Sequence, residues 1–311
     1  MACNLVGHRR SGQVSSIPKE EERTVVLEID RRRRAALIRR MLPDECRLCN
    51  DESMTDWSEF DALLVEGSTE ATEGWDFSWL DGRATEGRPS WGYLASLTQR
   101  LEGASAVLDI QTGGGETFAE ALSRSERLPE SLTATESWPP NVVVARRTLA
   151  PFGVVVVEAA ESDWLPFEDE SFDLVSSRHP TVKDWAEIYR VLEPDGLYFS
   201  QQIGAGTNSE LTDFFMGPQS ISDDQRLSVA VSEARRAGLE VIDAREESLP
   251  VVFFDVGAVV YFLRKVIWTV PDFSVERYRE RLAHLHERIE LEGRFVSHSA
   301  RILLEARKPP W

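Results

Sequence analysis

Between residues 106 and 201 the chain alternates short apolar runs with segments of helical periodicity. The runs are dominated by apolar and β-branched residues, which is typical of strands buried on both faces of a sheet. They predict strands at residues 106–110, 132–135, 154–157, 172–176 and 197–201, and helices at 116–123, from 139 onward and at 182–191. This alternation predicts right-handed crossovers and an α/β fold, a mostly parallel sheet with helices on both faces.

Two further strands complete a predicted seven-stranded sheet. A helix at residues 223–237 ends at Gly238, and strands are expected at 239–244 and 300–306. Between these strands, residues 248–293 predict a helical insertion, with an apolar run at 251–254, an apolar helix at 256–266 and a charged helix at 274–291. The aromatic residues of the insertion either line an apolar pocket or belong to the core, and a core role is favoured: Tyr261, Phe262, Trp268 and Phe273.

The first 74 residues predict an extension, partly helical and partly loop, before a main domain at residues 75–311. Apolar positions at helical spacing predict an amphipathic helix at 29–42, which Pro43 ends. The four arginines at 31–34 fit a solvated helix face, which is favoured, or a docking patch for nucleic acid. Cys46 and Cys49 have half the spacing of a zinc site, but too few ligands lie nearby, so no metal site is expected.

Charge and cysteine content narrow the class of partner. The chain has 53 acidic and 35 basic residues in 311, a net charge of -18, which opposes binding to a phosphate backbone and favours a small or cationic ligand. Three cysteines fit a reducing compartment. No apolar stretch is long enough to span a membrane, so a cytoplasmic protein, with homodimerisation open, is expected.

Three elements at predicted strand ends carry candidate chemistry. Residues 107–115 read Val-Leu-Asp-Ile-Gln-Thr-Gly-Gly-Gly, a glycine-rich turn between a strand and a helix, where a ligand can approach the backbone closely. Glu136 ends the next strand, where a carboxylate can accept the hydroxyl groups of a ribose. The third element, residues 161–175, is a loop that runs into the fourth strand. Carboxyl ends of parallel strands meet at one edge of a sheet, so the three should lie together.

Together these elements resemble the class I S-adenosylmethionine-dependent methyltransferases. The resemblance runs from about Trp75 to Lys308 and is most specific between Val107 and Gln202, a span that includes the stretch Leu-Pro-Phe-Glu-Asp-Glu-Ser-Phe-Asp at residues 165–173. It implies a Rossmann-like fold, S-adenosylmethionine as cofactor and methyl transfer as the activity. The insertion before the last strand then becomes the expected cover of the methyl acceptor.

The resemblance also implies a role for each matching position. Asp109 orients the methionine end of the cofactor, Gly113 and Gly115 form the turn beneath it, and Glu136 holds the ribose. Around the adenine the expected residues are Ser137, Trp138, Glu161, Ser162, Asp163 and Leu165, and Thr112 belongs to the turn. The family usually has glycine at the position of Gln111, a departure that bears on the cofactor's pose.

His179 is the candidate catalytic residue. The resemblance puts it beside the transferred methyl group, and imidazole titrates near neutrality, which suits a general base. A His-Pro pair after a strand also serves simply to end that strand.

Three functions remain open. The leading one is methylation of a small molecule at oxygen, nitrogen or carbon, by in-line attack on the sulfonium methyl. The second is methylation of a macromolecule, protein or RNA, with the arginines at 31–34 as docking residues. The third is a non-catalytic protein that keeps the cofactor site, which the Gln111 departure alone supports.

Overall fold

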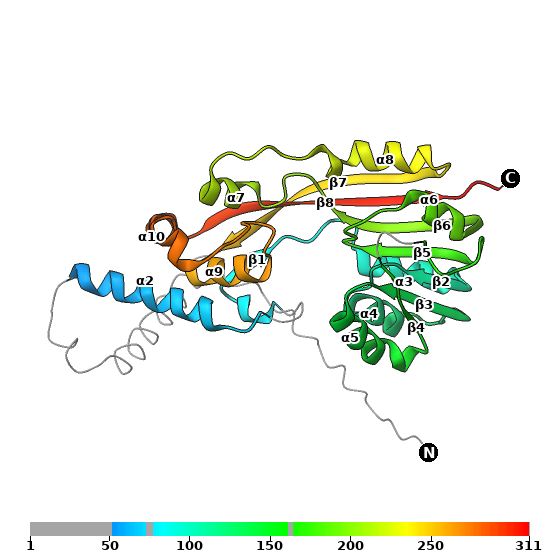
Figure 1. Cartoon of the computed structure of the whole chain (residues 1–311), viewed down its shortest axis with the longest axis horizontal. Helices are drawn as coiled ribbons and strands as arrows, with labels where there is room; N and C mark the ends of the chain where they lie inside the picture. Colours follow the sequence, from blue (N-terminus) through cyan, green and yellow to red (C-terminus); the bar gives the residue numbers. More distant parts are fainter. Residues whose placement is uncertain (1–51, 73–76, 161–163, 311) are drawn as a thin grey trace, which may run out of the picture. The chain divides into compact units, whose positions relative to one another are not determined.

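The computed structural model describes residues 52–72, 77–160 and 164–310 (Figure 1). The chain divides into two compact units, Met1–Ala62 and Leu63–Trp311, and helix α2 (Glu52–Thr69) spans the division. The helix expected at 29–42, the arginines at 31–34 and the Cys46–Cys49 pair lie outside the described residues. The proposed domain limit at residue 74 stays a prediction.

The second unit is built on an eight-stranded sheet in the order β1-β7-β8-β6-β5-β2-β3-β4. β2, β3, β4, β5 and β6 run parallel to one another, whereas β8 runs antiparallel to β6 and β7. All seven predicted strands are present: β2 (Ala106–Asp109), β3 (Ser131–Glu136), β4 (Val155–Glu158), β5 (Phe172–Arg178), β6 (Leu192–Ile203), β7 (Glu240–Phe253) and β8 (Phe295–Arg307).

The predicted strand count of seven is corrected to eight by β1 (Ala84–Glu86), which pairs antiparallel with β7. Its sequence, Ala-Thr-Glu, contains no apolar run, so nothing local marks it as a strand. The pairing with β7, more than 160 positions away, gives these residues their extended conformation.

Helices cover both faces of the sheet, as expected (Figure 1). Apolar side chains of α3 (Tyr93–Gly103), α4 (Glu116–Arg124) and α5 (Pro139–Leu149) pack on one face, in a cluster with β2, β3 and β6. On the other face, α6 (Trp185–Val191) and α8 (Leu227–Arg236) pack in a second cluster. The helix expected from residue 223 is split into a 3-10 turn (Asp223–Gln225) and α8, because Arg226 is extended.

The expected insertion differs from the structure at its start. Residues 251–253 of the expected apolar run belong to β7, which pairs with β8 from Glu240↔Arg307 to Phe253↔Phe295. Helices α9 (Val256–Lys265) and α10 (Val275–Glu292) connect these two long strands, each capped by a side chain, Asp255 and Ser274. Tyr261 on α9 is 2% exposed, in line with the favoured core role, whereas Trp268 is exposed.

Two helices were not predicted, α2 and α7 (Ser209–Met216). Within the described ranges, no helix combines the length and apolar character needed to cross a bilayer.

Candidate functional site

Polar side chains gather where β2, β3 and β5 end. Asp109 is the last residue of β2, Glu136 the last of β3 and Arg178 the last of β5. Because β2 lies between β3 and β5 in a parallel arrangement, the three side chains leave the sheet at the same edge. In open α/β sheets this edge is where ligands bind.

Asp109 is buried and held by neighbouring groups. Its Oδ1 accepts a hydrogen bond from the Ser176 hydroxyl on β5, with 2.6 Å between the oxygens. Burial raises the pKa of Asp109 to about 6, and hydroxyl groups and the charge of Arg178 offset only part of that rise. A buried carboxylate that resists ionisation is suited to meet a cation, which would stabilise its charged form.

The glycine turn lies against Glu136, at the end of the neighbouring strand. The two carboxylate oxygens of Glu136 accept backbone N–H groups from Gly113, at 2.8 Å, and from Trp138, at 2.9 Å. Each oxygen keeps further acceptor capacity, so hydroxyl groups of a ligand can bind as well. Glu136 therefore joins the turn to β3 and still offers the acceptor groups that a ribose needs.

Two glycines of the turn have left-handed backbone conformations that favour glycine, Gly113 with φ of 64° and Gly115 with φ of 81°. A Cβ at Gly115 would come within 2.8 Å of the Leu149 side chain, so the turn fits tightly on α5. At Gly113, by contrast, no described atom lies within 4 Å of the position of a Cβ. That open space is what a ligand resting on the turn requires.

Gln111 explains how the turn tolerates a residue other than glycine. Its φ is 56°, the left-handed conformation that glycine adopts most easily. Its side-chain amide bonds to the loop after β5: Nε2 donates to the carbonyl of Val182 at 2.7 Å, and Oε1 accepts the N–H of Thr181 at 2.7 Å. Gln111 thus ties the turn to the loop that follows β5.

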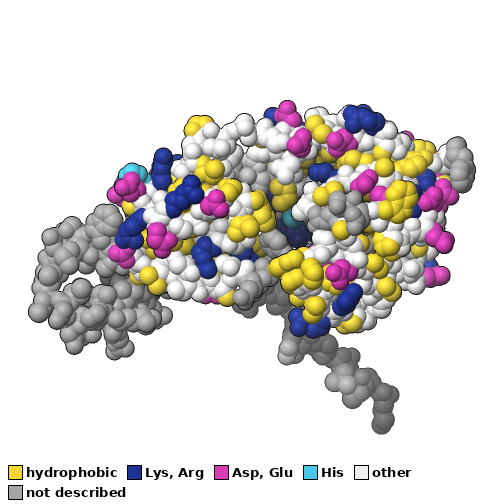
Figure 2. All heavy atoms as spheres, in the orientation of Figure 1, with side chains coloured by type: hydrophobic (Ala, Val, Ile, Leu, Met, Phe, Trp, Pro, Cys, Tyr) yellow, Lys and Arg dark blue, Asp and Glu magenta, His cyan; other side chains and the backbone are white. Residues whose placement is uncertain are grey.

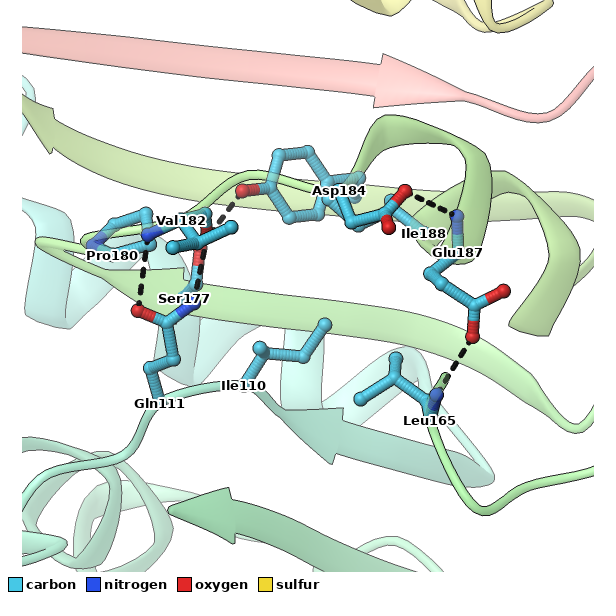
Figure 3. Close-up of a pocket in the computed structure, with 10 residues that line it drawn as sticks. Ile110, Gln111, Leu165, Ser177, Pro180, Val182, Asp184, Glu187 and Ile188 are labelled. Carbon is cyan, nitrogen blue, oxygen red and sulfur yellow. Dashed lines mark hydrogen bonds between the residues drawn. The ribbon is translucent and has the colours of Figure 1, made fainter. Parts of the chain in front are cut away.

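A pocket lies beside this tie, lined in part by Ile110, Gln111, Leu165, Pro180 and Ile188 (Figure 3). Figure 3 shows Gln111 reaching Val182 on one side of the pocket and Glu187 bonded to Leu165 on the other. Two residues predicted from sequence to hold the cofactor, Gln111 and Leu165, therefore line one pocket.

Glu187 and Arg190 on α6 fix the loop that contains Leu165. Glu187 accepts the N–H of Leu165 at 2.8 Å, while Arg190 donates to the carbonyl groups of Leu165, at 2.9 Å, and Phe167, at 2.7 Å. The Arg190 guanidinium also lies 4.3 Å from the centre of the Trp164 ring. The hydrogen bond from Arg190 lowers the pKa of Glu187, so the pair stays charged at neutral pH. The sequence motif contained Leu165 but gave no sign of this support.

His179 is the end of a chain of hydrogen bonds. The Trp91 indole N–H, which can only donate, bonds to Oε1 of Gln201 at 2.9 Å. This orients the Gln201 amide so that its Nε2 donates to Nε2 of His179 at 3.1 Å. The ring proton of His179 therefore sits on Nδ1. Burial, together with the charges of Arg178 and Arg301, holds the pKa of His179 well below its usual value, so the ring is neutral near pH 7.

The remaining predicted residues fall into two groups. Thr112 lies in the glycine turn, and Ser137 and Trp138 follow β3 directly, with Trp138 exposed. Glu161, Ser162 and Asp163 lie outside the described residues, so their expected place near the adenine stays a prediction. Trp91, Arg178, Gln201 and Arg301 were not predicted as site residues. They come from separate segments and share no motif.

Comparisons with known proteins agree with this geometry. Residues 108–200 match the model of a methyltransferase domain family. The comparison with curated proteins finds no matching sequence.

Among solved structures, a Bacillus halodurans protein assigned as a methyltransferase is 21% identical over 70% of this chain and 98% of its own, with a TM-score of 0.49. The YcgJ protein from Bacillus subtilis is 19% identical over 70% of this chain and 99% of its own, with a TM-score of 0.50. A phosphoethanolamine N-methyltransferase from Haemonchus contortus, solved with S-adenosylhomocysteine, is 18% identical over 70% of this chain and 53% of its own, with a TM-score of 0.43. At such identities the likeness is one of fold.

Proposed function

Because residues 108–200 form a class I methyltransferase domain that uses S-adenosylmethionine, we propose that the protein methylates a small-molecule acceptor at this edge of the sheet. The observation that carries the proposal is the joint placement of Asp109, the open glycine turn and Glu136 at the ends of β2 and β3.

The residues present fit the cofactor. Asp109 is a buried carboxylate whose raised pKa favours a cationic partner, and it takes the ammonium end of the methionine. Glu136 accepts the ribose hydroxyls, and the open side of Gly113 leaves room for the ligand above the turn. Trp138 and Leu165 pack on the adenine. When bound, S-adenosylmethionine supplies a methyl group made electrophilic by its sulfonium.

The protein's own contribution is positioning and proton removal. In-line alignment of the acceptor supplies most of the rate enhancement. The departing thioether is neutral and needs no protonation, so the only proton transfer is at the acceptor. His179, neutral near pH 7, is the proposed base for a hydroxyl or protonated amine acceptor. Its Nε2 lone pair is engaged by Gln201, so an acceptor proton takes the place of the Gln201 amide when the base acts.

Calorimetric titration with S-adenosylmethionine tests the cofactor site. The wild type is expected to bind one equivalent, and Glu136→Ala to bind about 100-fold more weakly, since two charge-assisted hydrogen bonds of about 1.5 kcal/mol each are lost. Glu130→Ala, an exposed carboxylate preceding β3, is the matched control and should bind as the wild type does. Thermal unfolding of each variant confirms that it is folded.

The Gln111 departure favours one alternative, a non-catalytic protein that keeps the fold. No binding by the wild type, or tight binding without release of S-adenosylhomocysteine across an acceptor library, would support that alternative over the enzyme. Methylation of a macromolecule has no support from the described residues, because the arginines at 31–34 lie outside them.

A further inference from the structure

Two arginines on different strands lie near the edge of the sheet that holds the candidate site. Arg178 ends β5 opposite Gln201 of β6, Gln201 lies opposite Leu303 of β8, and Arg301 is two positions from Leu303. Side chains two positions apart share a face of a sheet, and register neighbours do as well. Arg178 and Arg301 are therefore on one face, about 10 Å apart across the sheet and about 7 Å along it. Two long side chains can converge on a ligand between them.

Their charges are only partly compensated. Arg301 is 9% exposed and bonds to the Glu86 carboxylate on β1 and to the carbonyl of Ala300. Arg178 is exposed and donates to the Thr117 hydroxyl at 3.1 Å. Within the part of the chain that the structure describes, no carboxylate lies within ion-pair distance of Arg178.

The pKa values of nearby groups reflect the same excess of positive charge. The charge of Arg178, in addition to burial, lowers the pKa of Arg301, and both arginines lower the pKa of His179. Arg178 also lowers the pKa of Asp109 at the methionine end of the cofactor site. The positive charge therefore lies close to both the proposed base and the proposed cofactor site. Figure 2 shows a hollow near the middle of the view, with histidine and Lys/Arg atoms at its bottom.

We propose, building on the function above, that the site binds a carboxylate group between Arg178 and Arg301, with Arg178 as its main partner. A guanidinium that is accessible and lacks a protein carboxylate partner is suited to bind a carboxylate by paired hydrogen bonds. The group comes either from the methyl acceptor or from the methionine end of S-adenosylmethionine. In the first case the acceptor is an acid, the reverse of what the net charge of -18 predicts, because the local charge at this edge is opposite in sign.

The test compares Arg178→Met with Arg147→Met, an exposed arginine of α5 that serves as the matched control. Calorimetry measures four probes on each protein: S-adenosylmethionine, its decarboxylated analogue, benzoate and benzamide. The two aromatic probes are titrated with and without S-adenosylhomocysteine. Loss of one charge-assisted pair is expected to weaken binding of the relevant carboxylate about tenfold or more.

The two sources give different patterns. An acceptor carboxylate predicts that Arg178→Met weakens benzoate binding and leaves S-adenosylmethionine binding unchanged, with benzamide bound by neither protein. A cofactor carboxylate predicts weaker binding of S-adenosylmethionine and unchanged binding of the decarboxylated analogue. If Arg178→Met behaves as Arg147→Met does with all four probes, or the wild type binds no carboxylate in preference to its neutral partner, the proposal is wrong. Failure of the wild type to bind S-adenosylmethionine rejects the proposed function instead, and benzoate without cofactor still tests the arginines.

Discussion

The edge of the sheet has two halves, which we name by their proposed roles, a cofactor half and an acceptor half, and they differ in charge and in how the chain builds them. The cofactor half consists of Asp109, the turn at residues 111–115, Glu136 and Leu165. Its chemistry is that of buried carboxylates and backbone N–H groups. The acceptor half consists of Trp91, Arg178, His179, Gln201 and Arg301, and its chemistry is that of guanidinium groups and side-chain amides.

The comparison shows that the two halves are encoded differently in the sequence. The cofactor half comes from residues within about 60 positions of one another, and all but Leu165 lie at a strand end or directly after one, so it forms contiguous motifs. The acceptor half draws single residues from segments spread between Trp91 and Arg301. Such a set can change one residue at a time without disturbing the turn that holds the cofactor.

The largest expected effect concerns the cofactor half and the charge of Asp109. Its pKa is 3.8 in the unfolded reference and about 6 in the folded protein, so the folded state binds the proton more tightly. The stability that this provides is complete below about pH 4 and is lost as the pH rises through about 6, a difference of about 3 kcal/mol. Asp109→Asn should therefore stabilise the cofactor-free protein at pH 8 by up to about 3 kcal/mol while weakening cofactor binding.

Urea unfolding at pH 5 and pH 8 measures the first effect, and calorimetry the second. The variant should gain about half as much at pH 5 as at pH 8, because the carboxyl is largely protonated in the folded wild type at pH 5 but ionised in the unfolded chain. An equal gain at both pH values would show that the side chain's charge is not the cause.

A smaller effect is expected in the acceptor half from Trp91→Phe. The change leaves Oε1 of the buried Gln201 without its donor, which should cost about 2 kcal/mol in unfolding free energy. Cofactor affinity should stay within about twofold of the wild type, because the Trp91 indole bonds to Gln201 and to no residue of the cofactor half. The double variant with Gln201→Leu should lose less than the two single variants summed. A large loss of cofactor affinity in Trp91→Phe would mean that the halves are not separable.

The smallest effect is expected where the halves meet, at Gln111. Gln111→Gly removes the cost of about 1 kcal/mol that a left-handed conformation imposes on a non-glycine residue. It also removes the hydrogen bonds to Thr181 and Val182, whose total value is similar. The net change in stability should be under about 1 kcal/mol, whereas amide hydrogen exchange at Thr181 and Val182 should become faster. Gln111→Asn is the control, since asparagine tolerates the conformation but is one methylene shorter. Unchanged exchange in Gln111→Gly would show that the tie does not order the loop.

Much of the fold could be predicted because its central strands carry their own signal. Strands such as β2 and β5 contribute apolar side chains to the core clusters on both faces of the sheet, and burial on both faces favours an apolar composition. β1 could not be predicted, since its polar residues are extended only through pairing with β7. The start of the insertion was predicted wrongly for a related reason, because residues 251–253 continue β7 by pairing with β8.

The candidate site divides in the same way. Asp109, Gly113 and Glu136 lie in motifs whose spacing indicates a strand end, so the sequence was enough to group them. Gln111 was recognisable as a departure, but its partners in the loop after β5 depend on the fold. The link from Trp91 through Gln201 to His179 joins residues up to 110 positions apart, and nothing in their neighbours along the chain indicates it.

The long outer strand β7 bears on self-association. Among the described strands, β1 pairs only with residues 251–253 of β7, which leaves residues 240–250 as the margin of the sheet. That margin reads Glu-Val-Ile-Asp-Ala-Arg-Glu-Glu-Ser-Leu-Pro, with charged residues throughout and a proline at its end. Charges and proline on an edge strand discourage a second chain from adding to the ladder. A homodimer that extends the sheet through β7 is therefore disfavoured, and the same charges and proline oppose aggregation along residues 240–250.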